Sequence, residues 1–597
     1  MQFRFELEGG NFSKAGYASS QIKKVLKQLS VDPRIIKRVV VALYEAEVNV
    51  VAHAWRGTVL ADIEVDRISL LLQDEGPGIP DIGQAMQEGF STASAAVREM
   101  GFGAGMGLPN MKKNVDELTI ESKVGCPYAD LFLRKRQIAM EETKFYHALK
   151  IDNDRCVGCT HCMTKCPTGA IRIREGKASI RKGWCVDCGE CLKACPTEAI
   201  YVEQDDFQKI FDYKARVVLV PTVFIGQFSK YTTEEEIFSA LYELGFTHVF
   251  QVEFTADMIH REMLRQMELA ENKPVISSFC PAIVRLIQVR FPALVDNILL
   301  VKPPVNATAT YYHKVLEEDG FSSEEIGIFY VTPCAAKIAS LKGAEGYSST
   351  IKGVINMDTL YNKVYHILKN RPKNYTPECV LPPSLTKKEM RWSQTGGEAK
   401  HFSGRCLAID EIHNVIEFLE RMESTTEVRN VDFLELRACD RSCAGGVLAV
   451  ANRFLTAERV MKRSVKRDKA PLIYSDRLEA LSYLKQHITI RPLQPNPKLR
   501  YEGNIEEVLK KMEQVRKLMC YLPGIDCGAC GSPNCQALAE DIVRHEAQFS
   551  DCVFMQRNME KHGKLDKEHA FRLIEKTWGK DRLNKDCYKK GAKYEGQ

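Results

Sequence analysis

Two runs of cysteine with identical spacing constrain this chain more than any other feature of its sequence. Each run reads C-x2-C-x2-C-x3-C-P, and both lie between residues 156 and 196. Thiolates at this spacing bind [4Fe-4S] clusters, and the fourth cysteine of each run serves the other cluster. Zinc is the alternative, but two complete copies favour iron. We therefore expect one cluster on Cys156, Cys159, Cys162 and Cys195, and a second on Cys166, Cys185, Cys188 and Cys191.

The composition is that of a folded, multidomain protein, because 45% of the 597 residues are hydrophobic and 27% are charged. A net charge of +5 is too balanced to indicate nucleic-acid binding. No apolar run approaches the roughly 18 residues of a membrane span, and residues 1–10 lack a signal-peptide pattern. We expect no nucleic-acid partner, no membrane span and a cytoplasmic location, where 21 cysteines indicate metal binding rather than disulfides.

Five segments differ in pattern, and we expect them to correspond to separate parts of the fold. The expected ranges are 1–137, 144–207, 213–497 and 504–560, followed by a solvated basic tail at 561–597. The second segment, which holds the eight cysteines, resembles a bacterial-type ferredoxin. That resemblance implies a module that passes single electrons.

The first segment carries residues suited to nucleotide binding. Helical periodicity over Ile35–Ala52 places Glu45 and Asn49 four residues apart on one face. An asparagine oxygen suits Mg²⁺, and a glutamate can orient or deprotonate an attacking hydroxyl. Two strands are expected next, and Asp74 follows them with Gly76 and Gly78, which let the backbone approach a ligand. A glycine-rich run then precedes a helix at about Pro109 and favours phosphate; its glycines are Gly101, Gly103, Gly105 and Gly107.

The order E-x3-N, D-x-G-x-G, G-x-G-x-G-x-G resembles the ATPase fold shared by gyrases, Hsp90-type chaperones and histidine kinases. The stretch DEGPGIPDIGQAMQEGFSTAS is most similar to the anti-sigma-factor serine kinases of bacteria. The resemblance implies bound Mg-ATP, with Glu45 as catalytic base, Asn49 as Mg²⁺ ligand and Asp74 as adenine anchor. It leaves open whether the domain transfers phosphate or acts as a nucleotide-gated switch.

Four cysteines of the long third segment lie in three separate loops. They are Cys280 before a proline, Cys334 after one, and Cys439 and Cys443 before a pair of glycines. The loops resemble the catalytic domain of [FeFe]-hydrogenases, in which four such cysteines bind a [4Fe-4S] cluster. The resemblance implies that Cys443 bridges to a di-iron subsite bearing CO and cyanide. It also implies that Lys337 holds one cyanide and that the Pro221–Thr222 loop holds the other.

Three positions depart from the pattern of highly active hydrogenases. Phe279 replaces a proton-relaying cysteine, Arg437 replaces a methionine beside the di-iron site, and Ser340 replaces a glutamate of the proton path. Efficient hydrogen turnover is therefore not expected. The loops VTPCAAKIAS and LELRACDRSCAGG are more similar to the sensory group of this family. Whether the di-iron subsite assembles stays open, and a bare [4Fe-4S] cluster is the competing state.

The fourth segment contains a compact cysteine motif, C-x2-C-x4-C-x16-C, with a helix expected over Gln536–Phe549. It resembles the small four-cysteine iron–sulfur domain of electron-transfer complexes and sensory hydrogenases. Structural zinc is the alternative to a [4Fe-4S] cluster. The expected ligands are Cys527, Cys530, Cys535 and Cys552.

The expected fold class is multidomain α/β and α+β. It combines a kinase-type ATPase α/β sandwich, a bacterial ferredoxin fold, an [FeFe]-hydrogenase-like α/β domain and a small helical [4Fe-4S] domain. The expected cofactors are four [4Fe-4S] clusters, Mg-ATP and a di-iron subsite at Cys443 if one assembles. An electron chain joined to a nucleotide site favours a redox- or H₂-responsive regulator, whose partners are a ferredoxin or other electron carrier and a protein target.

The rival hypotheses are a slow [FeFe]-hydrogenase or ferredoxin-linked electron-transfer enzyme, and ATP-driven electron delivery. Enzymatic activity stays open between protein serine/threonine kinase activity, weak hydrogenase activity and neither.

Overall fold

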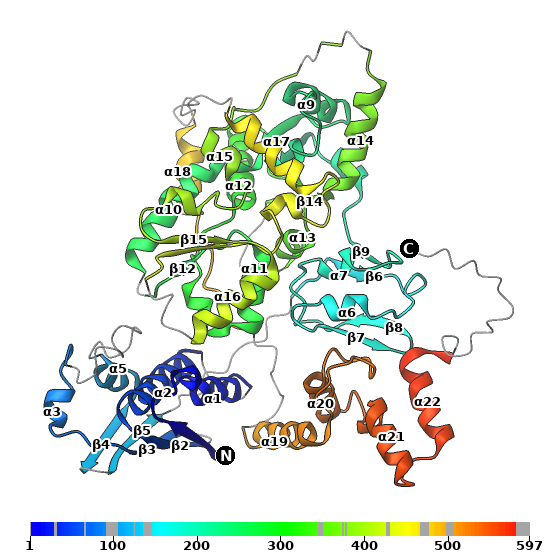
Figure 1. The fold of residues 1–597 in the computed structure, drawn as a ribbon. Coiled ribbons are helices and arrows are strands. Elements are labelled where there is room, and N and C mark those ends of the chain that lie inside the picture. The colour runs from blue at the N-terminus through cyan, green and yellow to red at the C-terminus, as the bar shows by residue number, and fades with distance from the viewer. Residues whose placement is uncertain are drawn as a thin grey trace.

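The computed structural model describes residues 2–28, 31, 33–64, 67–90, 106–123, 126–134, 145–270, 272–343, 350–372, 375–376, 379–424, 430–465, 477–496 and 505–580. These residues form an N-terminal domain, a ferredoxin-like module, a middle domain and a C-terminal domain (Figure 1). Within the described ranges, no helix has the length and apolar character needed to cross a bilayer.

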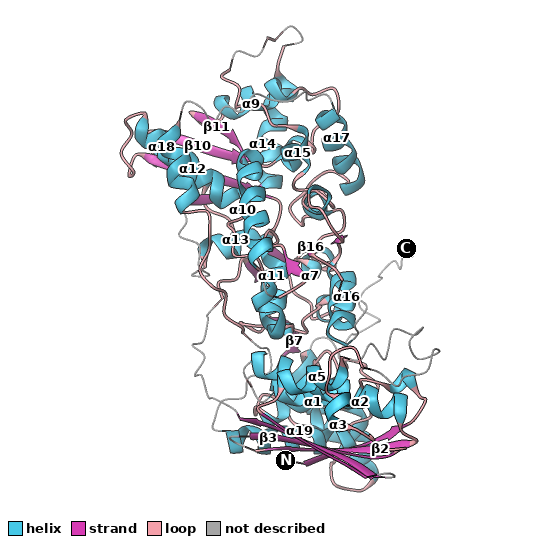
Figure 2. Cartoon of the chain, turned by 90° about the vertical axis from the view of Figure 1, so that its left-hand side faces the viewer, coloured by secondary structure: helices cyan, strands magenta, loops and turns pink. Residues whose placement is uncertain are grey.

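The N-terminal domain is an antiparallel sheet with helices on one face (Figures 1 and 2). Its strand order is β1-β2-β3-β5-β4. Buried residues alternate with less buried ones along β2, so that one side of this strand faces the core. The strands are β1 (Gln2–Glu8), β2 (Arg56–Ile63), β3 (Arg67–Glu75), β4 (Glu117–Lys123) and β5 (Cys126–Arg134). The helices are α1 (Tyr17–Gln28), α2 (Pro33–His53), α3 (Ile82–Ala85) and α5 (Gly107–Asn114).

The ferredoxin-like module repeats one unit, a short helix between paired strands. The first pair is β6 (Leu149–Ile151) with β9 (Ile200–Val202), and the second is the hairpin of β7 (Ile171–Arg174) and β8 (Lys177–Ile180). The helices are α6 (His161–Lys165) and α7 (Glu190–Lys193). Because the strands are short and the helices brief, most of the module's interior is formed by its cysteine loops.

The middle domain contains two parallel sheets, as expected for buried α/β architecture. The larger sheet has the order β11-β10-β13-β14, and the smaller has the order β12-β16-β15. Its strands are β10 (Ala215–Val220), β11 (His248–Gln251), β12 (Val275–Ile276), β13 (Ile326–Thr332), β14 (Ile351–Asn356), β15 (Cys406–Ile409) and β16 (Phe433–Leu436). Every residue of β13 is buried, which fits a central strand covered on both faces.

Helices of the middle domain cover both sheets (Figure 2). They are α8 (Thr222–Ile225), α9 (Glu234–Glu243), α10 (Ala256–Leu269), α11 (Pro281–Arg290), α12 (Pro304–Glu318), α13 (Ala335–Lys342), α14 (Met357–Asn370), α15 (Lys387–Arg391), α16 (Ile412–Ser424), α17 (Arg453–Val465) and α18 (Leu478–Gln486).

The C-terminal domain is helical and lies beside the N-terminal domain and below the ferredoxin-like module in Figure 1. Its helices are α19 (Ile505–Tyr521), α20 (Cys535–Val543), α21 (Val553–Lys561) and α22 (Lys567–Trp578). The helix expected over Gln536–Phe549 ends at Val543, because His545 has a φ of +61°, a left-handed conformation that terminates helices. The segment expected to be a solvated tail contains α22, whose apolar residues Ala570 and Leu573 are buried.

The domains share apolar interiors. One hydrophobic cluster runs from the N-terminal core into α19 and α20, and another joins the ferredoxin-like module to the larger sheet of the middle domain. In addition, α2 packs against a 3₁₀ turn of the middle domain, Pro292–Asn297. The Lys37 ammonium donates to the Asn272 side chain at 2.7 Å in the same region.

Candidate functional site

The ferredoxin-like module contains two small cavities, and the expected cysteine sets line them. Cys156, Cys159, Cys162 and Cys195 surround the first cavity. Cys166, Cys185, Cys188 and Cys191 surround the second. Because the fourth cysteine of each run lies in the other run's cavity, the two runs interlock.

The chemistry of these thiols fits a bound iron–sulfur cluster. Burial raises the pKa of the Cys162 thiol to about 12, with smaller contributions from the neighbouring cysteines. Backbone N–H groups nevertheless point at the sulfurs, with Ala170 N donating to Cys166 Sγ at 3.2 Å and Ala199 N to Cys195 Sγ at 3.3 Å. Such donors stabilise negative sulfur, whereas buried neutral thiols do not need them. The site is therefore built for thiolates held by a metal.

A buried charge network at the second cavity has no counterpart in the sequence motifs. Asp187 accepts hydrogen bonds from Arg285 at 2.7 Å and from the Ala148 backbone at 3.0 Å, and it lies 2.9 Å from His147 Nδ1. Arg285 belongs to α11, the helix that Cys280 precedes. This network ties the ferredoxin-like module to the middle domain. No local pattern in the sequence indicates this network, because its members are far apart in the chain.

Three loops of the middle domain bring four cysteines together. Cys280 and Cys334 are the residues before α11 and α13, and Cys439 and Cys443 flank the start of a 3₁₀ turn, Ser442–Gly445. The four thiols lie close enough to shift one another's pKa. Burial has the largest effect on Cys439 and, together with the charges of the other three cysteines, raises its pKa well above the usual value. A side chain at Gly446 would collide with the Pro333 carbonyl, so glycine is required for these loops to meet.

Lys337 lies beside the last of these cysteines. It sits in the first turn of α13, and its Nζ is 3.7 Å from Cys443 Sγ. Burial lowers the pKa of Lys337, but Cys443, Tyr330 and Cys334 raise it by more, so the ammonium stays charged. A fixed positive charge next to a cysteine thiolate can hold an anionic ligand or stabilise a reduced cluster.

Two of the three residues that depart from the hydrogenase pattern, Phe279 and Arg437, belong to one buried assembly. The Arg437 guanidinium carbon lies 3.7 Å from the centre of the Phe279 ring. Arg437 also pairs with Glu398 at 2.8 Å and with Glu435 at 3.4 Å. The Ser277 hydroxyl donates to Glu398 at 2.7 Å. Arg437 Nη1 has no hydrogen-bond partner among the described residues, which leaves a buried donor in the assembly.

In the loop expected to face a second cyanide, Thr222 contacts two polar side chains. The backbone N–H and hydroxyl of Thr222 both donate to Glu253 at 3.0 Å, and the hydroxyl is also 3.0 Å from Ser393. Burial raises the pKa of Glu253 to about 7, against the effect of the Thr222 donors. Ser340 is buried in α13.

The C-terminal domain also gathers its four cysteines. Cys530, Cys535 and Cys552 are buried and Cys527 is exposed. Burial raises the pKa of the Cys530 thiol to about 11, and Cys552 and Cys527 contribute through their charge. The donor set again consists of thiols held around one point, as an iron–sulfur cluster or zinc requires.

The N-terminal domain places its expected nucleotide residues around the ends of α2, β3 and α5. Asn110 of α5 donates to Glu45 at 2.9 Å, and a Cβ at Gly107 would lie 3.0 Å from the Asn49 side-chain oxygen. Burial raises the pKa of Asp74 to about 6. Gly76 is buried and packs against Ala54, whereas Gly78 has a φ of +79°. Gly101, Gly103 and Gly105 lie outside the described residues.

A second glutamate on α2 has a structural role that the sequence did not indicate. Glu47 is fully buried and accepts from the backbone N–H groups of Ala18 and Ser19 at 2.8 and 2.9 Å. It therefore caps the start of α1 and fixes this helix to α2. Glu45 and Glu47 differ in role because they lie on different faces of one helix.

Taken together, the folds and the four thiol sets define an iron–sulfur protein joined to a kinase-type ATPase domain. Family models match in the same order along the chain. A histidine kinase-like ATPase domain matches residues 14–127, a 4Fe-4S dicluster domain matches 148–197, the C-terminal domain of the iron only hydrogenase large subunit matches 214–362, and an Fe-S cluster model matches 522–554.

Individual relatives agree with the family models. The serine/threonine-protein kinase RsbT of Bacillus subtilis is 32% identical over 107 residues, which are 17% of this chain and 74% of RsbT. The periplasmic [Fe] hydrogenase large subunit of Nitratidesulfovibrio vulgaris is 32% identical over 214 residues, 32% of this chain and 50% of that subunit. A structure of the [FeFe]-hydrogenase HydA1 from Chlamydomonas reinhardtii is 16% identical, with a TM-score of 0.38. The match covers 48% of this chain and 96% of the HydA1 chain.

The chain belongs to the histidine kinase-like ATPase family through its N-terminal domain. It also matches models of iron–sulfur and iron only hydrogenase domains over 148–197, 214–362 and 522–554. It spans about three quarters of the kinase relative but only half of the hydrogenase subunit. The resemblances to these families that the sequence motifs indicated are confirmed, and so is the expected fold class.

Proposed function

We propose that the chain is a redox- or H₂-responsive regulator in which the iron–sulfur domains control an ATP-binding, serine-kinase-like domain. The observation that carries this proposal is the position of α2. This helix bears Glu45 and Asn49, and its start contacts the middle domain through Lys37 and Asn272. Lys37 and Glu45 are two turns, about 12 Å, apart on one rigid helix. A movement of the middle domain is therefore transmitted directly to the nucleotide residues.

We further propose the site residues and cofactors. Glu45 acts as the base, Asn49 binds Mg²⁺, Asp74 accepts from adenine, and the glycines Gly76, Gly78, Gly101, Gly103, Gly105 and Gly107 leave room for nucleotide. Four [4Fe-4S] clusters occupy the four cysteine sets, and Lys337 and the free Arg437 donor suit a di-iron subsite at Cys443. The proposed partners are a ferredoxin or other electron carrier and a protein target of the ATPase domain, in the cytoplasm. The domain boundaries stay predictions.

The test measures Mg-ATP binding to the full-length protein under anaerobic conditions. Affinity is compared between oxidised and dithionite-reduced protein, each with and without H₂. A coupling of about 1.4 kcal/mol changes the affinity tenfold. Lys37→Ala should reduce this change while preserving ATP binding, and Lys14→Ala, at an exposed position outside this contact, serves as the matched control. Equal affinities in all four states would overturn the proposal.

A slow hydrogenase or ferredoxin-linked electron-transfer enzyme is the second candidate. The ammonium of Lys337 beside Cys443 favours it, because the same arrangement would hold a cyanide of a di-iron subsite. An infrared spectrum of anaerobically maturated protein tests this candidate, since CO and cyanide absorb where protein does not. Bands from both ligands together with H₂ turnover that survives Asn49→Ala would favour the enzyme over the regulator.

A further inference from the structure

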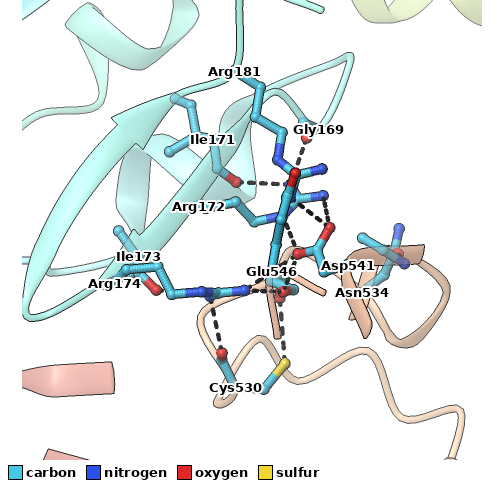
Figure 3. Close-up of polar contacts among 12 residues, drawn as sticks. Gly169, Ile171, Arg172, Ile173, Arg174, Arg181, Cys530, Asn534, Asp541 and Glu546 are labelled. Carbon is cyan, nitrogen blue, oxygen red and sulfur yellow. Dashed lines mark hydrogen bonds and ion pairs between the residues drawn. The ribbon is translucent and has the colours of Figure 1, made fainter. Parts of the chain in front are cut away.

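One buried carboxylate joins the C-terminal domain to the ferredoxin-like hairpin. Asp541 of α20 is fully buried. Arg172 of β7 donates to it through Nε at 2.6 Å and through Nη2 at 3.1 Å. Arg174 pairs with it at 3.2 Å and Arg181 at 2.8 Å. Figure 3 shows the three guanidinium groups of the hairpin converging on this side chain. A carboxylate shared by three arginines is a specific docking contact.

The cysteine loop of the C-terminal domain is held by the same hairpin. The Ile173 backbone N–H donates to the Gly531 carbonyl at 2.9 Å, and Arg174 donates to the Cys530 carbonyl at 3.2 Å and to the Ser532 hydroxyl at 3.1 Å. A side chain at Gly531 would collide with the Ile173 carbonyl, so this close approach requires glycine. The hairpin therefore fixes the loop that carries Cys527, Cys530 and Cys535.

The same loop also contacts a residue next to the first ferredoxin-like cysteine set. A Cβ at Gly528 would lie 3.0 Å from Cε of Met163, a buried residue that follows the expected ligand Cys162. Gly528 itself follows the expected ligand Cys527. Residues next to ligands of two different cysteine sets are thus in contact, and the two sets are neighbours across the interface.

Helix α22 closes the interface from the other side. The turn of the hairpin donates to the end of this helix, from Glu175 N to the Lys576 carbonyl at 3.0 Å and from Gly176 N to the Thr577 carbonyl at 2.9 Å. The Trp578 indole N–H donates to the Ala529 carbonyl at 3.1 Å, within the cysteine loop. Contacts from two sides restrict the loop to one position relative to the hairpin.

The interface carries an excess of positive charge. Among the described residues, Arg172, Arg174 and Arg181 pair with Asp541, and Arg181 also pairs with Glu546. Three guanidinium groups thus meet two carboxylates at this contact. A cluster bound by four thiolates is anionic, and becomes more so on reduction. The arginines therefore suit a cysteine loop that gains negative charge.

We propose that Asp541 is a positioning residue that docks the C-terminal cysteine set against the first ferredoxin-like set, so that their clusters exchange electrons directly. The inference rests on the ligand sets of the proposed function. One electron leaves the cluster of one set and enters that of the other, and a low-potential one-electron carrier protein supplies or removes it. The C-terminal cluster is then the outer end of an electron chain that continues through the ferredoxin-like module to the middle domain.

The test is electron paramagnetic resonance of the dithionite-reduced full-length protein. Two reduced clusters in neighbouring domains broaden each other's signals by spin–spin interaction. In Asp541→Asn three arginines lose their shared carboxylate, the dock opens, and an uncoupled signal of the C-terminal cluster should appear while the iron content is unchanged. Asp541→Glu should restore the broadening in part. The control is Glu568→Gln on α22, which removes an exposed ion pair with Arg572 and should leave the broadening intact.

Arg172→Gln tests the same contact from the ferredoxin-like side, should Asp541→Asn lose the C-terminal iron. Retained iron with lost coupling supports the dock. Unchanged coupling in both variants, or an uncoupled C-terminal signal in the unmodified protein, overturns it. These outcomes do not depend on ATP, so failure of the dock is distinguishable from failure of the regulatory proposal.

Discussion

The ferredoxin-like cavities and the middle-domain pocket each gather four thiols, but their surroundings differ. Besides cysteine, apolar residues, glycine and threonine line the ferredoxin-like cavities. The middle-domain pocket instead has Lys337 beside Cys443 and Arg437 stacked on Phe279, with Glu398 and Glu435 behind it. Buried charges are costly unless paired. The ferredoxin-like side has its own buried pair, Asp187 with Arg285, which joins two domains. In the middle domain the cation Lys337 instead lies 3.7 Å from a cysteine sulfur, which indicates that this site does more than hold a cluster.

The largest expected effect comes from breaking the charge assembly of the middle domain. Arg437→Met leaves Glu398 and Glu435 buried without a cation, which should lower the free energy of unfolding of this domain by about 3–5 kcal/mol. Guanidinium unfolding followed by circular dichroism measures it. Lys462→Met is the control, because its ion pair with Glu458 is at the surface and should contribute at most about 1 kcal/mol. Equal losses in both variants would show that the assembly is not stabilising.

A smaller effect is expected at the cluster itself. Lys337→Met removes a positive charge that stabilises the reduced, more negative state of the middle-domain cluster. Its reduction potential should fall by roughly 60–120 mV, equivalent to about 1.4–2.8 kcal/mol. A redox titration followed by electron paramagnetic resonance measures this shift. The ferredoxin-like potentials should not move, and a uniform shift of all clusters would remove the contrast between the pockets.

The nucleotide site lies between these two kinds of site, because it has one half-buried carboxyl group with no cation paired to it among the described residues. Burial raises the pKa of this group, Asp74, to about 6. The adenine amino group donates, so it needs the ionised carboxylate. Below pH 6 ATP binding must displace a proton, and affinity should fall by up to about tenfold per pH unit, or about 1.4 kcal/mol. Above about pH 7 the affinity should be constant. Calorimetric titration at several pH values measures the profile.

Asp74→Asn provides the control for this profile. The variant cannot ionise at this position, so its ATP affinity should be weaker by about 1–3 kcal/mol at pH 7.5 and flat across the acidic range. A wild-type profile that persists in the variant would assign the titration to another group.

The smallest effect is expected in the apolar cavities. The Thr168 hydroxyl lies 3.6 Å from Cys166 Sγ, a weak contact with a sulfur. Thr168→Val should shift the potential of that cluster by no more than about 20 mV, near 0.5 kcal/mol. The redox titration used for Lys337→Met detects it. A shift as large as that of Lys337→Met would mean that polar contacts control both kinds of pocket equally.

Local patterns predicted much of the architecture. Periodicity over Ile35–Ala52 matches α2, and the two strands expected between this helix and Gly76 match β2 and β3. The fold class and the presence of iron–sulfur and kinase-like domains followed from spacing and motif order. These features are encoded within a few turns or one loop, where neighbouring residues determine the structure.

Contacts between distant residues could not be predicted in the same way. Arg172 and Asp541 are separated by 369 positions, and neither belongs to a motif. The stacking of Arg437 on Phe279 joins two substitutions that look independent in the sequence. The residues of α22 fall in the segment expected to be a solvated tail, because the hairpin that this helix contacts lies about 400 residues earlier in the chain. Such contacts depend on how the domains pack against one another, and local periodicity in the sequence does not indicate domain packing.

The distance between Arg172 and Asp541 along the chain also sets an order of events during synthesis. At about 5–20 residues per second, translation over these 369 positions takes roughly 20–75 s. The ferredoxin-like hairpin therefore leaves the ribosome with its three arginines long before their carboxylate exists. Over that interval the three arginines stay exposed on the surface of the folded module. Helix α20, which covers them, is synthesised only when nearly all the described chain has been made.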